Sequence, residues 1–281
     1  MKHLIPLLLP FVFAGIICAH AQTGGPSFQV TKTGNGRQSI VFIPGFACSG
    51  DVWKETVALY SPHYTCYVLT MPGFAGAPPE KTPELGGWVS QIAGFIREEH
   101  LQRPVVVGHS LGGVMALMLA GRYPDLIGKF VVVDALPCLP ALMNPAFVPA
   151  AHPGCDAWGA QFRAIGDSVF YQQQRQGMLQ LLADTSRLAE IVDWGVRSDR
   201  RTLGNIYCQL SNLDLRDSLH PIVCPALIML EAPFAELRPA IETQYKGLAQ
   251  GRIHYATKGL HFIMYDDPQW YRNELTDFLP L

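Results

Sequence analysis

One stretch of this chain, residues 105–113, limits the possible folds more than any other. Its sequence, VVVGHSLGG, runs three valines directly into a G-x-S-x-G pattern. The chain has 26 glycines, so the pattern alone is weak evidence, but both of its flanks agree. Residues 103–107 are typical of a buried strand, and residues 114–120 are typical of a helix that Pro124 ends. A serine between such elements sits on a tight, strained turn with its hydroxyl clear of the sheet, where a nucleophile belongs.

The composition describes a globular chain without a preference for polyanionic partners. Of its 281 residues, 49% are hydrophobic and 16% are charged, which is enough material for one large core or two small ones. The formal net charge is −2, and no basic run alternates with aromatic residues. We therefore expect no nucleic acid among the partners of this protein.

The first 21 residues are predicted to be a signal peptide. Residues 1–3 form a short positive region, residues 4–18 are apolar, and the AHA of residues 19–21 fits the small-x-small cleavage rule. Cleavage there would leave Gln22 as the first mature residue, and a lipoprotein signal at Cys18 is the weaker alternative. The apolar run is shorter than the roughly 20 residues that span a bilayer. We expect a periplasmic or secreted protein with no stable membrane span.

The cysteines after the predicted signal peptide do not have the spacing of a metal site. No C-x-x-C pair or Cys/His cluster occurs, so we expect no bound metal. An oxidising compartment would allow some of them to form disulfides, and buried thiols are the equally open alternative. They are Cys48, Cys66, Cys138, Cys155, Cys208 and Cys224.

Strand and helix patterns alternate over most of the remaining chain. The strand candidates are residues 28–31, 39–43, 64–70, 104–108, 129–134, 226–231 and 252–256. The GNG of residues 34–36 supplies turn chemistry and predicts a hairpin between the first two strands. Thr82 with Pro83, and Asp267 with Pro268, predict the starts of two helices. The alternation predicts an α/β fold with a mainly parallel sheet covered by helices on both faces.

Residues 137–221 break this alternation. They contain no strong strand pattern, whereas residues 161–180 and 181–196 are typical of helices rich in Gln, Met, Leu and aromatic side chains. Because strand patterns resume beyond this segment, we interpret it as a helical cap. The cap is inserted into a core formed by residues 22–136 and 222–281.

Three ordered motifs resemble those of the α/β-hydrolase fold superfamily, and within it the capped, esterase-like serine hydrolases. They are IPGF at residues 43–46, GHSLG at residues 108–112 and GLHF at residues 259–262. The resemblance covers nearly the whole chain after the signal peptide. It implies a mostly parallel central sheet with helices on both faces and an inserted helical cap. The fold alone does not determine which reaction is catalysed.

The resemblance also implies a nucleophile and a base. Ser110 is the expected nucleophile, on an elbow whose sharp turn uses Gly108 and Gly112. A hydroxyl is a poor nucleophile at neutral pH unless an imidazole takes its proton. His261 follows the last strand, where the family places that base, and we expect His109 to pack or line the site instead.

The acid that orients His261 is harder to assign. The G-x-x-D pattern that the family commonly carries after the penultimate strand is missing. We choose Asp134, at the end of the strand that follows the nucleophile helix, because a buried carboxylate there would accept the imidazole N–H. Glu231 and Glu236 are the alternatives.

By the same resemblance, the backbone N–H groups of Phe46 and Leu111 form the oxyanion hole. The expected activity is that of a carboxylesterase-like serine hydrolase. It would form an acyl-enzyme with a small to medium, partly hydrophobic ester and use no metal or organic cofactor. A serine nucleophile excludes haloalkane dehalogenase and epoxide hydrolase chemistry, which the family performs with Asp. Amidase, aminopeptidase-type and lactonase activities remain alternatives, and a non-catalytic ligand-binding protein is the alternative of another class.

Overall fold

The computed structural model describes residues 25–281, so the predicted signal peptide lies outside the described residues. A seven-stranded sheet in the order β1-β3-β2-β4-β5-β6-β7 forms the centre. The strands are β1 (Gln29–Thr33), β2 (Ser39–Ile43), β3 (Thr65–Thr70), β4 (Val105–His109), β5 (Lys129–Val133), β6 (Ala226–Leu230) and β7 (Gly251–Tyr255). All neighbouring strands are parallel except β1 and β3. The predicted mainly parallel α/β fold is confirmed.

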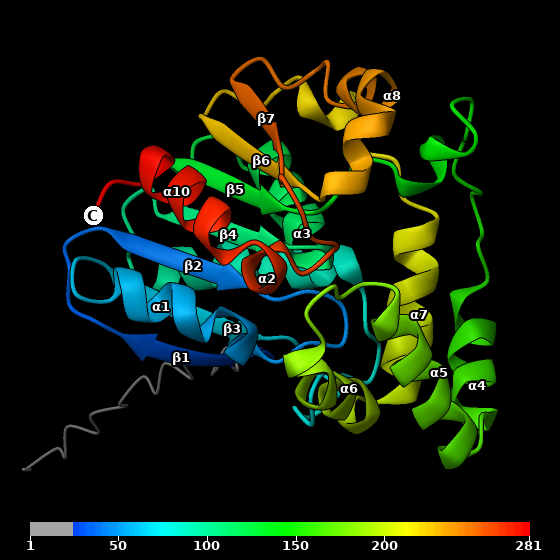
Figure 1. Cartoon of the computed structure of the whole chain (residues 1–281). Helices are drawn as coiled ribbons and strands as arrows, with labels where there is room; N and C mark the ends of the chain where they lie inside the picture. The colour runs from blue at the N-terminus through cyan, green and yellow to red at the C-terminus, as the bar shows by residue number, and fades with distance from the viewer. Residues whose placement is uncertain (1–24) are drawn as a thin grey trace, which may run out of the picture.

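Alternation along the strands divides the side chains between two hydrophobic layers. In β2, Val41 and Ile43 belong to one buried cluster, whereas Ile40 and Phe42 belong to the other. This period of two is a property of extended backbone, and both of its faces are apolar because helices cover both faces of the sheet. In Figure 1, α2 and α3 cover one face and α1 and α10 the other. The helices of the core are α1 (Lys54–Tyr60), α2 (Leu85–Glu98), α3 (Leu111–Arg122), α8 (Arg238–Gln244), α9 (Ile263–Asp266) and α10 (Pro268–Phe278).

Between β5 and β6 the described chain forms helices and no strand. The helices are α4 (Cys155–Ala164), α5 (Asp167–Leu179), α6 (Leu188–Arg197) and α7 (Arg200–Ser211), and we call residues 155–211 the helical insertion. Figure 1 shows it at the carboxyl-terminal edge of the parallel strands. A disulfide between Cys155 and Cys208 joins α4 to α7. The assignment of a cap to residues 137–221 stays a prediction.

Helix α7 fastens the helical insertion to the core. Leu203 and Ile206 are buried in the same cluster as α2 and α3. The side chain of Gln209 accepts a hydrogen bond from the N–H of Leu85 at 2.8 Å and donates one to the carbonyl oxygen of Pro83 at 3.1 Å. These contacts fix one end of the insertion against the segment that begins α2. No helix within residues 25–281 is both long and apolar enough to cross a bilayer.

The predicted hairpin is wrong. Strand β1 pairs antiparallel with β3, for example Val30 with Leu69, and β2 lies on the other side of β3. The turn residues do bend the chain, because Gly34 has a φ of +82°. Turn chemistry shows where a chain bends, but the pairing partner depends on the α1 crossover that carries β3 into the sheet between β1 and β2.

Two predicted helix starts also need correction. Helix α2 begins at Leu85 instead of following a cap at Thr82. Helix α10 begins at Pro268 as expected, but the Asp267 side chain makes no capping hydrogen bond. Its carboxylate accepts one from the hydroxyl of Thr257 at 2.6 Å. Each proline lies within two residues of a helix start, but the residue before it does not cap the helix with its side chain.

The insertion has four helices where the sequence predicted two, over residues 161–180 and 181–196. An extended residue, Gly166, separates α4 from α5. The pattern missed α7 because its apolar residues form a narrow stripe among Arg, Asn and Gln. Of the cysteines, Cys155 and Cys208 form the disulfide, and the other four in the described chain are buried thiols.

Candidate active site

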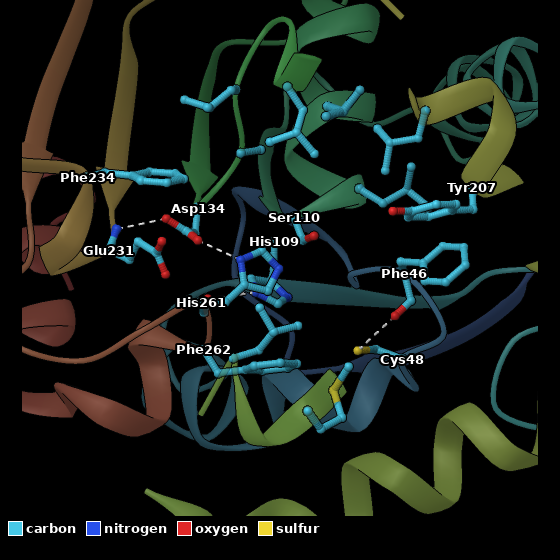
Figure 2. A pocket seen from close by; sticks show the side chains of 18 residues that line it. Phe46, Cys48, His109, Ser110, Asp134, Tyr207, Glu231, Phe234, His261 and Phe262 are labelled. Atoms are coloured by element: carbon cyan, nitrogen blue, oxygen red, sulfur yellow. Dashed lines mark hydrogen bonds and ion pairs between the residues drawn. The ribbon is translucent and has the colours of Figure 1, made fainter. Parts of the chain in front are cut away.

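Four loops at the carboxyl ends of neighbouring parallel strands meet around one cavity. Ser110 follows β4, and Asp134 follows β5. Glu231 follows β6, and His261 lies in the loop after β7. All four line a cavity of about 360 Å³ (Figure 2). Open α/β sheets bind their ligands at this edge, because the loops that follow the strands converge there.

The walls of the cavity are mostly apolar. Phe46, Val114 and Phe262 line it from the core, and the insertion adds Met178 and Tyr207 from above the strand ends. No lysine or arginine is among its lining residues. The cavity therefore suits a ligand with a hydrophobic portion, held against a small number of polar groups.

The turn at Ser110 is strained, and glycines make it possible. Ser110 has φ +53° and ψ −120°, a backbone conformation that residues with a side chain rarely adopt. Its N–H donates to the carbonyl oxygen of Val133 at 2.8 Å, which ties the turn to β5. A Cβ atom on Gly108 would clash with the backbone of Gly112, and one on Gly112 would clash with the backbone of Ile43. The G-x-S-x-G pattern thus has a steric reason in this fold.

The carboxylate of Asp134 holds the ring of His261. Its Oδ2 accepts a hydrogen bond from His261 Nδ1 at 2.5 Å, and its Oδ1 accepts one from the backbone N–H of Glu231 at 2.7 Å. Asp134 is 3% exposed, and a carboxylate so buried needs such donors. With Nδ1 engaged, Nε2 is the ring nitrogen of His261 that has no hydrogen-bond partner among the described residues, and Ser110 lies in the same cavity (Figure 2).

Of the three carboxylates considered from the sequence, Asp134 is the one that contacts His261. Glu231 contributes its backbone N–H to Asp134, while its side chain lines the cavity. Glu236 lies in the short 3-10 helix Ala232–Leu237, is exposed, and is not among the lining residues.

Two backbone N–H groups flank Ser110 from different elements. Leu111 is the first residue of α3, where N–H groups have no acceptor within the helix. Phe46 lies in the turn after β2, and Gly45 lets that turn come close: a Cβ there would lie 2.7 Å from His109 Nδ1 and 3.3 Å from Ser110 Cβ. Both Phe46 and Leu111 line the cavity. Such a pair of donors is suited to stabilising an oxyanion.

The alpha/beta hydrolase family model matches residues 40–274. This chain belongs to the alpha/beta hydrolase family. It is 26% identical over 205 residues to the pimeloyl-[acyl-carrier protein] methyl ester esterase of Vibrio cholerae, covering 71% of this chain and 76% of that one. The match to the protein of the same name from Pectobacterium carotovorum is 27% identical over 108 residues and spans 41% of that relative.

Solved structures of the family share the fold of this hydrolase. An enol-lactonase from Burkholderia xenovorans LB400 aligns with a TM-score of 0.74 and 17% identity, over 90% of this chain and 96% of that one. A thermophilic esterase from Thermogutta terrifontis aligns with a TM-score of 0.73 and 15% identity, over 90% and 92%. The resemblance to the α/β-hydrolase fold superfamily, and the mostly parallel sheet with helices that it implied, are confirmed.

His109 packs against His261 and Phe262. It is 1% exposed, and its Nε2 lies 3.0 Å from the carbonyl oxygen of His261. Its ring centroid is 4.7 Å from that of His261 and 4.8 Å from that of Phe262. Burial, reinforced by the neighbouring His261, lowers the pKa of His109 well below its usual value. A neutral His109 donates its Nε2–H to that carbonyl and helps to fix the loop carrying His261.

Asp266 joins the insertion to the loop that carries His261. Its carboxylate accepts hydrogen bonds from the N–H groups of Ala183 at 3.0 Å and Asp184 at 2.8 Å, both in the insertion. It also accepts one from the N–H of Leu260 at 2.8 Å. This role was not predictable from the sequence, because two of the three donors lie more than 80 positions away.

Cys48 and Glu231 also line the cavity. Burial raises the pKa of the Cys48 thiol to about 12, so this cysteine stays protonated and is no nucleophile. Burial, followed by the charge of Asp134, raises the pKa of Glu231 to about 7. Within residues 25–281, no group of His, Cys, Asp and Glu side chains has the arrangement of a metal site.

Proposed function

We propose that this chain is a serine hydrolase that cleaves a carboxylic ester of a small to medium, partly hydrophobic substrate through an acyl-enzyme. The contact of Asp134 with His261, in the cavity that also holds the strained Ser110 turn, carries the proposal. Relatives named methyl ester esterases, and a structural neighbour described as an esterase, support an ester as the bond cleaved.

In the first half of the reaction, Ser110 Oγ attacks the ester carbonyl carbon while His261 Nε2 takes the hydroxyl proton. Asp134 accepts the Nδ1–H and stabilises the imidazolium that forms. The N–H groups of Phe46 and Leu111 stabilise the negative charge on the former carbonyl oxygen. As the tetrahedral intermediate collapses, the bond to the alcohol oxygen breaks and His261 returns its proton to that oxygen.

In the second half, water attacks the acyl group on Ser110 while His261 accepts a proton from the water. Collapse of the second tetrahedral intermediate breaks the bond to Oγ, and His261 gives the proton back to Ser110. The acid leaves, and the enzyme returns to its starting state. Apart from the ester and one water molecule, these steps need only side chains and backbone groups of the chain.

The test of the proposal is the Ser110→Ala variant, measured against esters of increasing acyl length, lactones and aminoacyl amides. We expect turnover to fall by about 10⁴-fold or more, because nothing else at the site replaces the nucleophile. A fluorophosphonate probe should label the wild-type protein and not the variant. Wild-type turnover in the variant would refute the proposal. No labelling of the folded wild-type protein would favour a non-catalytic binding protein.

We also propose that the protein is exported, with its signal peptide removed after Ala21. The disulfide between Cys155 and Cys208 supports this, because disulfides persist in oxidising compartments and are rare in the cytosol. N-terminal sequencing of the protein from fractionated cells should begin at Gln22, in the periplasm or the medium. Recovery from the cytoplasm with residues 1–21 attached would contradict export.

A further inference from the structure

Glu231 is a charged group at the cavity that the proposed reaction does not use. It follows β6, its side chain is half-buried, and it lines the cavity. In the described chain its hydrogen bonds come from its backbone, through the N–H to Asp134 and the carbonyl oxygen from Phe234. The carboxylate itself has no hydrogen-bond or ion-pair partner among residues 25–281.

The surroundings of this carboxylate are unusual for a half-buried acid. The cavity lining holds no lysine or arginine that would neutralise it. Asp134 and Asp266 add negative charge nearby, whereas His261 favours the ionised form. By contrast, Asp134 has donors on both of its oxygens, and Asp266 has three backbone donors. Burial partly desolvates this carboxylate, and a ligand that brings a positive charge compensates for the lost hydration.

An aromatic ring lies on the same side of the cavity. Phe234, from the 3-10 helix that follows Glu231, lines the cavity and is partly buried. Figure 2 shows Glu231 and Phe234 on the side of the triad away from Phe46 and Tyr207. A carboxylate next to an aromatic ring is a combination that attracts an ammonium group, through charge and through the face of the ring.

We propose that Glu231 is a specificity residue that binds an ammonium group of the substrate beside the triad, so that this hydrolase prefers cationic esters over neutral or anionic ones. This inference rests on the proposed ester hydrolysis. The rest of the substrate lies against the apolar walls formed by the core and the insertion. Esters that carry a carboxylate on this side are disfavoured, because Glu231, Asp134 and Asp266 repel it.

The preference depends on pH in a definite direction. Glu231, whose pKa is raised to about 7, is neutral below that pH and a carboxylate above it. The titratable groups that face it are Asp134 after β5, His261 after β7 and Asp266 at the end of α9. Both esters use the same proposed triad, so a ratio of their rates removes the pH effects that the two reactions share. The ratio of the two rates therefore reports Glu231, and it should rise as the pH passes upward through about 7.

A matched pair of esters tests the inference. Butyrylcholine and 3,3-dimethylbutyl butyrate have nearly the same shape and differ in one fixed positive charge. We expect the wild-type protein at pH 8 to have a kcat/KM about tenfold higher for the cationic ester, because its ammonium group is attracted to the Glu231 carboxylate by charge and to the Phe234 ring by a cation–π contact. Glu231→Gln should lower this ratio to about one and remove its dependence on pH. The control Glu236→Gln removes the same charge at an exposed residue outside the cavity and should leave the ratio unchanged.

Binding provides a readout that does not require turnover. Calorimetric titration with choline at pH 8 should show binding to the wild-type protein and to Glu231→Asp, which keeps the charge, and about tenfold weaker binding to Glu231→Gln, which loses the Coulomb attraction. Thermal unfolding of each variant checks that it is folded. The inference is overturned if choline binds the wild type and Glu231→Gln equally or not at all, or if the ester ratio is the same in both. If either of these results occurs while Ser110 is still required for hydrolysis of the neutral ester, the proposed function is unaffected. If the fluorophosphonate probe does not label the protein and no ester is hydrolysed, the proposed function itself is wrong.

Discussion

The edge of the sheet and the helical insertion both line the cavity, yet they are held in different ways. At the sheet edge, the N–H of Ser110 donates to Val133 and the N–H of Asp134 donates to Met229, so both residues continue the hydrogen-bonded ladder. Both also have a positive φ, +53° and +52°. The ladder supports this strain, because neighbouring strands fix the backbone on both sides. Groups that must meet within hydrogen-bond distance lie where the backbone has the least freedom.

The insertion is held by several side-chain links in addition to a backbone hydrogen bond from the N–H of Asp199 to the carbonyl oxygen of Gly73 at 2.7 Å. Its links include the disulfide from α4 to α7, an ion pair of Arg200 with Asp167 at 2.6 Å, and one of Arg187 with Glu55 at 2.5 Å. Both ion pairs have partners open to solvent, where such pairs contribute little. The insertion provides walls such as Met178 and no member of the proposed triad. The sheet edge thus carries the proposed triad and Glu231, whereas the insertion adds part of the cavity wall.

Asp134→Asn, at the sheet edge, is the variant for which we expect the largest loss of activity. The amide would keep the shape but would favour the wrong tautomer of His261 and would not stabilise its cation. We expect kcat for a neutral ester to fall about 10⁴-fold while the melting temperature changes little in comparison. Steady-state kinetics and thermal unfolding measure both.

The double variant Asp134→Asn/Glu231→Gln is the control for this prediction. If Glu231 were the acid that orients His261, the single Asp134 variant would keep most of its turnover and the double variant would lose it. A loss of less than tenfold in the single variant would therefore contradict the assignment of Asp134.

Asp266→Asn tests the junction between the two regions. An asparagine offers one acceptor oxygen where the carboxylate has two, and its amide group would face backbone N–H donors. We expect the free energy of unfolding to fall by about 1–3 kcal/mol. Because Leu260 precedes His261, we also expect kcat/KM to fall about tenfold or more, with a shifted pH profile. Such a result would identify Asp266 as a positioning residue.

Asp267→Asn is the matched control, because Asp267 is also buried but accepts a hydrogen bond from Thr257 instead of the insertion. It should lower the melting temperature without moving the pH profile of kcat/KM. If both variants lose stability and neither changes that profile, Asp266 has only a structural role.

The same contrast explains what the sequence could and could not predict. The core strands were predictable because each is a short apolar run, and residues such as Ser110 and Asp134 stand at the ends of those runs. Their adjacency follows once the strands are parallel neighbours. Strand order was not predictable from local signals, as the pairing of β1 with β3 shows. The role of Asp266 was also hidden, because backbone N–H groups of distant segments leave no trace in the residue types.

The smallest change in kcat should come from the double variant Cys155→Ser/Cys208→Ser, in the helical insertion. The disulfide closes a segment of 53 residues, and its loss releases about 4 kcal/mol of unfolded-state constraint. We expect the insertion to unfold at a lower temperature, with less than a threefold change in kcat for the shortest ester. The kcat/KM for long acyl chains should fall further, because these need the wall that Met178 helps to form. Reducing the disulfide of the wild-type protein should produce the same changes in unfolding temperature and kcat/KM, and reductant should not affect the variant. If kcat falls equally for short and long esters, the insertion instead takes part in positioning the catalytic groups.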